Sequence, residues 1–148
     1  YSGTVGAAIA GRRLDYVPVA FSVTSFNPEN LAFIAEKALW ITNQATKLPS
    51  DKNLLMNINF PDLPPSQVQG IRLTTLGKRG VPDTPDFIRA NDSSKFYSFG
   101  PSGSLLPDQL GTDIQAIENN YISISILDYN LSANNANWDL YKEVFGCE

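Results

Sequence analysis

A chain of 148 residues with a hydrophobic share of 43% is long enough for one domain and ordinary for a soluble globular protein. Its net charge of −4 argues against a general nucleic-acid surface, although a local pocket can still bind one phosphate group. No apolar run reaches about 18 residues, so no membrane span is expected. With the charge, this leaves neither a membrane nor a nucleic-acid duplex as an expected partner. The sequence has no His and one Cys, Cys147, so it lacks the commonest metal ligand and cannot form an internal disulfide.

The beginning of the chain predicts a tight turn that leads directly into a helix, which we expect to run from Gly3 to about Leu14. Ser2 suits the N-cap, Gly3 leaves the backbone open to close approach, and Thr4 adds a second hydroxyl. Free N–H groups and the positive end of the helix dipole then point at one spot, which is typical of an anion or phosphate site. The alternative is a capped helix whose small residues only allow close packing.

A strand–helix–strand unit follows. The apolar run over residues 17–23 predicts a strand buried on both faces, as in a parallel sheet. Asn27 is the expected N-cap of the next helix and Pro28 its first residue. A second strand is expected over residues 54–60, which completes a βαβ unit.

Two Asn residues interrupt the apolar pattern of that second strand. Alternation places Met56 and Ile58 on one face and Leu55, Asn57 and Asn59 on the other. Asn opposes strand propensity, so these two side chains either bind a ligand or bond to nearby loop backbone.

The rest of the chain contains shorter elements joined by Gly- and Pro-rich segments. A break in the pattern from Gly77 indicates a loop or an extended arm, and the Asn119-Asn120 pair is expected to end a short helix in the left-handed conformation. The expected elements are a strand over 71–76, a hairpin over 87–99, a helix over 111–118, a strand over 121–126 and an amphipathic helix over 138–145.

Five segments in this order resemble the SurE family (survival protein E), and they are spread over nearly the whole chain. The segments are Tyr1-Ser2-Gly3-Thr4-Val5-Gly6-Ala7-Ala8, then Leu55-Met56-Asn57-Ile58-Asn59-Phe60-Pro61-Asp62-Leu63-Pro64, then Gly70-Ile71-Arg72-Leu73-Thr74-Thr75-Leu76-Gly77-Lys78-Arg79, and finally Gly111-Thr112-Asp113 with Tyr121-Ile122-Ser123-Ile124-Ser125.

The resemblance implies an α/β fold: part of a Rossmann-like parallel or mixed sheet with helices on both faces and a protruding β-hairpin arm. Because the first segment lies in mid-chain in the family, we expect this chain to be the C-terminal portion of a single SurE-like domain. Residues 1–76 would form the α/β core. Residues 77–148 would form the hairpin arm and a C-terminal oligomerisation region, giving a homodimer or tetramer.

SurE proteins are metal-dependent phosphatases that act on nucleoside 5′- and 3′-monophosphates. The resemblance therefore implies a nucleotidase, a phosphomonoesterase of nucleoside monophosphates. The lone Cys147 is compatible with a reducing compartment, and a cytoplasmic location is expected. Ser2, Gly3 and Thr4 are the expected phosphate-binding residues. Thr112 and Asp113 are expected on the substrate side, although the same motif also suits a plain helix cap. The catalytic residues stay unknown.

No metal ligand is assigned in this chain, although the complete protein is expected to use Mg²⁺ or Mn²⁺. The family's ligands, an Asp-Asp pair, a Ser and an Asn, would all lie before Tyr1. Asp83, Asp86 and Asp92 are scattered in a loop, where carboxylates are usually solvated.

Two alternatives remain open at this stage. Phe96, Tyr97 and Phe99 could stack on a nucleotide base, or they could be core or interface aromatics of a hairpin. The chain as a whole could also be a non-catalytic module for nucleotide binding or oligomerisation.

Overall fold

The computed structural model describes residues 3–49, 53–99, 103, 106, 109–130 and 137–146. Ser2 and Cys147, which carry two of the sequence expectations, lie outside the described residues.

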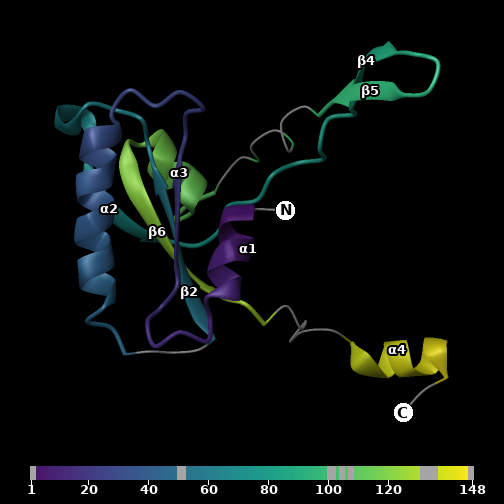
Figure 1. The fold of residues 1–148 in the computed structure, drawn as a ribbon. Helices are drawn as coiled ribbons and strands as arrows, with labels where there is room; N and C mark the ends of the chain where they lie inside the picture. The colour runs from purple at the N-terminus through teal and green to yellow at the C-terminus, as the bar shows by residue number, and fades with distance from the viewer. Residues whose placement is uncertain are drawn as a thin grey trace.

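A mixed four-stranded sheet forms the centre of the molecule, with the strand order β1-β2-β6-β3 (Figure 1). Its strands are β1 (Val19–Val23), β2 (Leu54–Phe60), β6 (Tyr121–Asp128) and β3 (Gly70–Thr74). β1 pairs with β2 in parallel, β6 runs antiparallel to β2, and β3 pairs with β6 in parallel. The predicted fold class, a parallel or mixed sheet with flanking helices, is confirmed.

Helices cover both faces of the sheet (Figure 1). The two larger ones are α1 (Gly3–Ala10) and α2 (Leu31–Ala45). Leu55 of β2 packs in one buried cluster with α1, whereas its neighbour Met56 packs in the other cluster with α2. The alternation read from the sequence therefore assigns the correct face to each residue of β2. α3 (Asp113–Glu118) lies on the same side of the sheet as α1.

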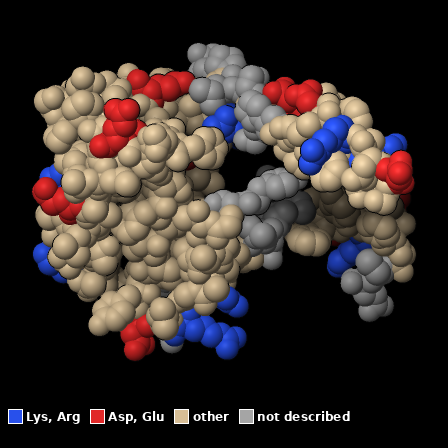
Figure 2. All heavy atoms as spheres, turned by 45° about the horizontal axis from the view of Figure 1, so that its top comes forward, with Lys and Arg blue, Asp and Glu red and all other residues tan. Residues whose placement is uncertain are grey.

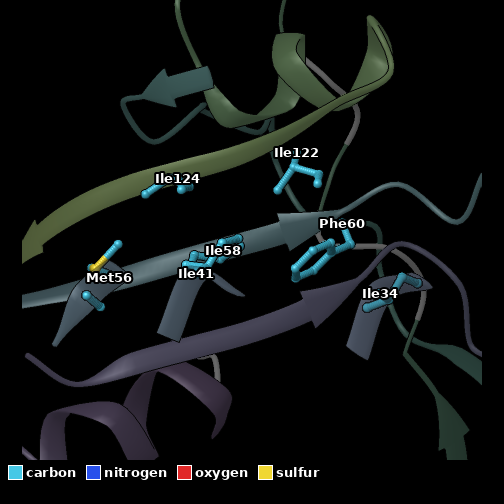
Figure 3. Close-up of a cluster of buried hydrophobic side chains, with 8 residues drawn as sticks. Ile34, Ile41, Met56, Ile58, Phe60, Ile122 and Ile124 are labelled. Carbon is cyan, nitrogen blue, oxygen red and sulfur yellow. The ribbon is translucent and has the colours of Figure 1, made fainter. Parts of the chain in front are cut away.

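The main core lies between α2 and the middle strands of the sheet (Figure 3). Ile58 is fully buried at its centre and Phe60 is 1% exposed. The buried members are Ile34, Ile41, Ala45, Met56, Ile58, Phe60, Ile122 and Ile124. β6, which follows Gly77 in the chain, contributes Ile122 and Ile124 to this core. The core therefore extends beyond the boundary near Leu76 that was expected to separate it from the arm.

α1 ends earlier than expected. It stops at Ala10 and not near Leu14. The Gly11 N–H is shared between the carbonyl oxygens of Ala7 and Ala8, at 3.3 and 3.0 Å, and the Arg12 N–H then reaches back only three residues, to Ile9. Such a shared bond is common at helix ends.

The start of α2 was also mispredicted. Asn27 is not its N-cap and Pro28 is not its first residue, since the helix begins at Leu31 after Asn30. The backbone N–H groups of Glu29 and Asn30 donate instead to the Asp62 carboxylate, which follows β2. A partner 32 residues away therefore supplies the cap.

The remaining elements agree with the sequence expectations. Asn120 adopts the predicted left-handed conformation after α3, with φ of 64°. The hairpin of β4 (Asp86–Ala90) and β5 (Lys95–Ser98) projects away from the sheet, and α4 (Trp138–Phe145) stands apart from it as well (Figure 1). A short 3-10 helix, η1 (Pro65–Gln67), precedes β3.

Candidate functional site

The first turn of α1 is open to solvent. Gly3 and Thr4 are both exposed, and the helix carries no acidic residue in this turn that would repel an anion. A Cβ on Gly3 would meet no described atom within 4 Å, so the space on that side of Gly3 is open. The predicted phosphate-binding turn is therefore accessible, while Ser2 lies outside the described residues.

The packing of α1 against β1 shows where this turn lies along the sheet. Gly11 approaches Pro18, and Ala8 packs with Ala20, so the helix runs opposite to the strand. From Ala8 back to Gly3 the helix rises about 7.5 Å, at about 1.5 Å per residue. Two strand residues span about 6.6 Å, which places the first turn of α1 near the level of Ser22.

Polar side chains occupy the same face of the sheet at this level. Ser22 of β1 pairs in register with Asn59 of β2, and Asn59 pairs with Ser123 of β6. The Asn59 Nδ2 donates to Ser123 Oγ at 3.2 Å, so Asn59 bonds to a neighbouring strand and not to loop backbone. This bond leaves the Asn59 Oδ1 available as an acceptor.

A second polar row lies one step further along the strands. Ser125 and Thr74 share a hydrogen bond of 2.8 Å between their hydroxyls. Asn57 pairs in register with Ser125 and is 7% exposed, yet its side chain makes no hydrogen bond to another described residue. The first row thus crosses β1, β2 and β6, and the second crosses β2, β6 and β3, both on the side that α1 and α3 cover.

A cavity of about 240 Å³ lies beside the first of these rows, between the sheet and α3. Its apolar walls are Val23, Ile114 and Ile117. Its polar lining residues are Thr24, Asn59, Arg79, Asp113 and Glu118. Since Val23 and Thr24 are the end of β1, the cavity and the first turn of α1 lie at the same end of the sheet.

Thr112 and Asp113 form a helix cap. The Thr112 Oγ1 accepts from the Gln115 N–H at 3.3 Å and donates to the Gln109 carbonyl at 2.7 Å. One Asp113 oxygen, Oδ1, accepts from the N–H groups of Gly77 at 2.7 Å and Ile114 at 2.9 Å. The capping alternative is therefore confirmed. The substrate-side role of the two residues stays a prediction, and of the two only Asp113 lines the cavity.

Sequence reasoning named Asn59 as a possible ligand contact but assigned no site role to Arg79 or Glu118. Asn59 carried a signal, because alternation put an amide on one face of a strand. Arg79 and Glu118 carried none: Arg79 follows β3 and Glu118 ends α3, and the bond from Gly77 to Asp113 brings these segments together across 36 residues.

The described residues form no cluster of metal-ligating side chains. Among the described residues, no group of three or more His, Cys, Asp or Glu side chains gathers in one place. The three loop acids singled out in the sequence, Asp83, Asp86 and Asp92, therefore form no such group. Asp113 already uses one carboxylate oxygen to hold two backbone N–H groups.

The hairpin aromatics do not belong to the core of this chain. Tyr97 packs edge-on against Phe87 with ring centroids 5.7 Å apart, and the Arg89 guanidinium lies 4.7 Å from the centre of the Phe96 ring. Phe99 is 83% exposed. Two roles therefore remain for these aromatic side chains: packing at an interface or stacking on a nucleotide base.

Surface charge agrees with the composition. On the face shown in Figure 2, acidic and basic side chains are scattered and form no continuous basic surface. Within the described part of the chain, none of the helices has the length and apolar character needed to cross a bilayer.

The sequence profile of the family described as "Survival protein SurE" matches residues 1–83. The chain belongs to the SurE family. The resemblance read from the motifs is thus confirmed, and the matched region includes α1, β1, α2, β2 and β3.

SurE relatives resemble the chain well beyond the matched region. The 5′-nucleotidase SurE of Alkalilimnicola ehrlichii is 37% identical over 89% of the chain and 51% of the relative. The 5′/3′-nucleotidase SurE of Wigglesworthia glossinidia brevipalpis is 32% identical over 96% of the chain and 59% of the relative. The crystal structure of the SurE protein from Aquifex aeolicus aligns with a TM-score of 0.69 at 27% identity, over 97% of this chain and 56% of that one. The chain therefore spans about half the length of the SurE relatives it matches.

Proposed function

We propose that the complete protein hydrolyses nucleoside 5′- or 3′-monophosphates, and that this chain supplies the phosphate-binding turn at the start of α1. The observation that carries the proposal is the exposed, acid-free first turn of α1, which lies at the same end of the sheet as a cavity lined by polar and apolar side chains. The names of the relatives, 5′-nucleotidase and 5′/3′-nucleotidase, support the same reaction class.

The role of α1 follows from the charge of a phosphomonoester. Backbone N–H groups of the first turn donate to phosphoryl oxygens, and the helix dipole favours the negative charge there. Ser2 and Thr4 add hydroxyl donors, and Gly3 lets the phosphate approach the backbone. Fixed donors of this kind stabilise the charge that is spread over the oxygens in the transition state of phosphoryl transfer.

The proposal includes a divalent cation, Mg²⁺ or Mn²⁺. Its ligands would belong to residues other than those described, because no metal-ligating group forms among the described ones. A catalytic Mg²⁺ generally takes at least one or two carboxylates.

The proposal also includes self-association through the hairpin and α4. Both elements expose aromatic side chains: Phe87 is 58% exposed on β4, and Trp138 and Phe145 are 59% and 72% exposed on α4. A two-stranded hairpin is at best marginally stable alone, and exposed apolar patches of this kind mark interaction sites.

Phosphate release from 5′-AMP and 3′-AMP by the complete protein tests the reaction. We expect release that a chelator abolishes and that added Mg²⁺ or Mn²⁺ restores. Binding of AMP with no release under any metal would reject hydrolysis and favour the non-catalytic nucleotide-binding module. If the complete protein neither binds AMP nor releases phosphate, the remaining interpretation is a module for oligomerisation.

A further inference from the structure

We propose that the cavity between β2 and α3 binds the nucleoside part of the substrate, with its side-chain acceptors facing the ribose hydroxyls and its apolar walls facing the base. This inference rests on the proposed function and deepens it, because it assigns the non-reacting half of the substrate to a second place in the chain.

The position of the cavity fits this role. A nucleotide joins a phosphate to a nucleoside, so a site for the second group must lie at the same end and on the same face of the sheet as the first. Asn59 lines the cavity and pairs in register with Ser22, the level reached by the first turn of α1.

The size of the cavity also fits. Its volume of about 240 Å³ lies below the range of about 300–1,000 Å³ for sites that enclose drug-sized ligands. It therefore has room for part of a nucleotide, and the phosphate can remain outside at the open turn of α1.

The polar side chains in the cavity can form further hydrogen bonds. Asn59 donates to Ser123, which leaves its Oδ1 free to accept. Asp113 accepts its two backbone bonds at Oδ1, so Oδ2 remains. Ionised carboxylates only accept hydrogen bonds, and they therefore select a ligand that carries O–H or N–H donors, such as a ribose.

Arg79 supplies the complementary donor. Its Nη1 donates to the carbonyl of Gly103 at 3.3 Å, and it has no ion-pair partner among the described residues. A guanidinium has five N–H donors, so several remain for the acceptor atoms of a base or for the phosphate edge. Ile114 and Ile117 give the flat base an apolar surface.

Two variants of the complete protein test the cavity, with AMP and glycerol 2-phosphate as substrates. Glycerol 2-phosphate carries a phosphate but no nucleoside. Ile117→Trp fills the cavity, and Glu118→Gln removes a charged acceptor from an exposed position. Matched controls are Leu39→Trp and Glu36→Gln, both on α2 and on the other side of the sheet.

We expect Ile117→Trp to raise the KM for AMP by about tenfold or more and Glu118→Gln by about fivefold, as the loss of one or two net hydrogen bonds or contacts implies. The kcat for AMP and the KM for glycerol 2-phosphate should change by less than about twofold, because lost ground-state binding appears in KM alone. Equal effects on both substrates, or no effect on AMP, would overturn the inference.

Adenosine binding by calorimetry separates this inference from the proposed function. If the complete protein releases no phosphate but binds adenosine, and Ile117→Trp abolishes that binding, the cavity assignment stands and the hydrolase proposal fails. If the protein hydrolyses AMP but shows no adenosine binding at millimolar concentration, the cavity assignment is wrong. If the complete protein neither releases phosphate nor binds adenosine, both the hydrolase proposal and the cavity assignment are rejected.

Discussion

The carboxylate of Asp62 accepts from the backbone N–H of Asn30 at 3.1 Å and from its side-chain Nδ2 at 3.0 Å. The Glu29 N–H donates to the same carboxylate, and the Thr24 Oγ1 accepts from the Asp62 N–H at 3.3 Å. Asp62 thus joins the ends of β1 and β2 to the start of α2, through its backbone N–H to Thr24 and through its carboxylate to Glu29 and Asn30. The Asn30 amide and then the Glu29 N–H lower the pKa of Asp62 below its ordinary value of 3.8.

Replacing Asp62 with Asn should lower the melting temperature at pH 7. The folded-state pKa of Asp62 lies below its unfolded value, so its stabilisation is fully present above the unfolded pKa and is lost as pH falls through the folded pKa. The difference in melting temperature between wild type and Asp62→Asn should therefore shrink below about pH 4. Asp83→Asn is the charge-matched control and should show little difference at either pH. A difference for Asp62→Asn that stays constant across this pH range would contradict the argument.

Local sequence signals were sufficient where the decisive contacts are local. The alternation over β2 separated Met56 and Ile58 from Leu55 and Asn57, and the Asn pair after α3 predicted the left-handed Asn120. Both depend on the backbone period or on one residue's conformational preference.

The start of α2 and the cavity could not be predicted in this way, because both depend on long-range contacts. Asp62 takes over the capping that Asn27 was expected to provide. The cavity exists because Asp113 holds Gly77 against α3, which brings Arg79 to the side of Asn59. A phosphate-binding role for the first turn of α1 is a proposal that the residues at the helix start and the family motif suggested. The level of this turn relative to the cavity could be found only from the sheet register.

The core should be sensitive at Ile58. Ile58→Ala removes buried methyl groups from a fully buried position and should lower the free energy of unfolding by about 2–5 kcal/mol. Leu73→Ala, at a position that is 79% exposed, should stay within about 0.5 kcal/mol. Denaturant unfolding of the complete protein measures both, and comparable losses at the two positions would show that the core is placed incorrectly.

The phosphate-binding turn should depend on its two hydroxyls. Ser2→Ala alone should cost about 0.5–2 kcal/mol of stability as a lost N-cap. The double variant Ser2→Ala, Thr4→Ala in the complete protein should weaken phosphate binding about tenfold or more, since hydrogen bonds to charged groups contribute about 1.5–3 kcal/mol. Calorimetric titration with inorganic phosphate measures this. Thr46→Ala, at the end of α2, is the control. Unchanged affinity in the double variant would leave Ser2 and Thr4 with a capping role only.

The hairpin should be needed for self-association. The double variant Phe87→Ser, Phe99→Ser removes two exposed aromatic side chains and should shift the complete protein toward monomer in sedimentation experiments at micromolar concentration. Leu14→Ser, Leu39→Ser removes two exposed apolar side chains from the body of the molecule and should leave the oligomer unchanged. A wild-type protein that sediments strictly as a monomer with a folded hairpin would refute the interface.

The central claim is that residues 1–148 supply the phosphate-binding turn while the metal ligands lie elsewhere in the complete protein. The most direct test measures phosphate release from AMP in parallel for the complete protein and for a polypeptide of residues 1–148. The mass of the shorter polypeptide must show that no residues precede residue 1. The complete protein should release phosphate in a metal-dependent way, whereas the shorter polypeptide should release none at any Mg²⁺ or Mn²⁺ concentration, because its described residues hold no cluster of three or more His, Cys, Asp or Glu side chains. Metal-dependent release by residues 1–148 alone, or no release by the complete protein, would contradict the account.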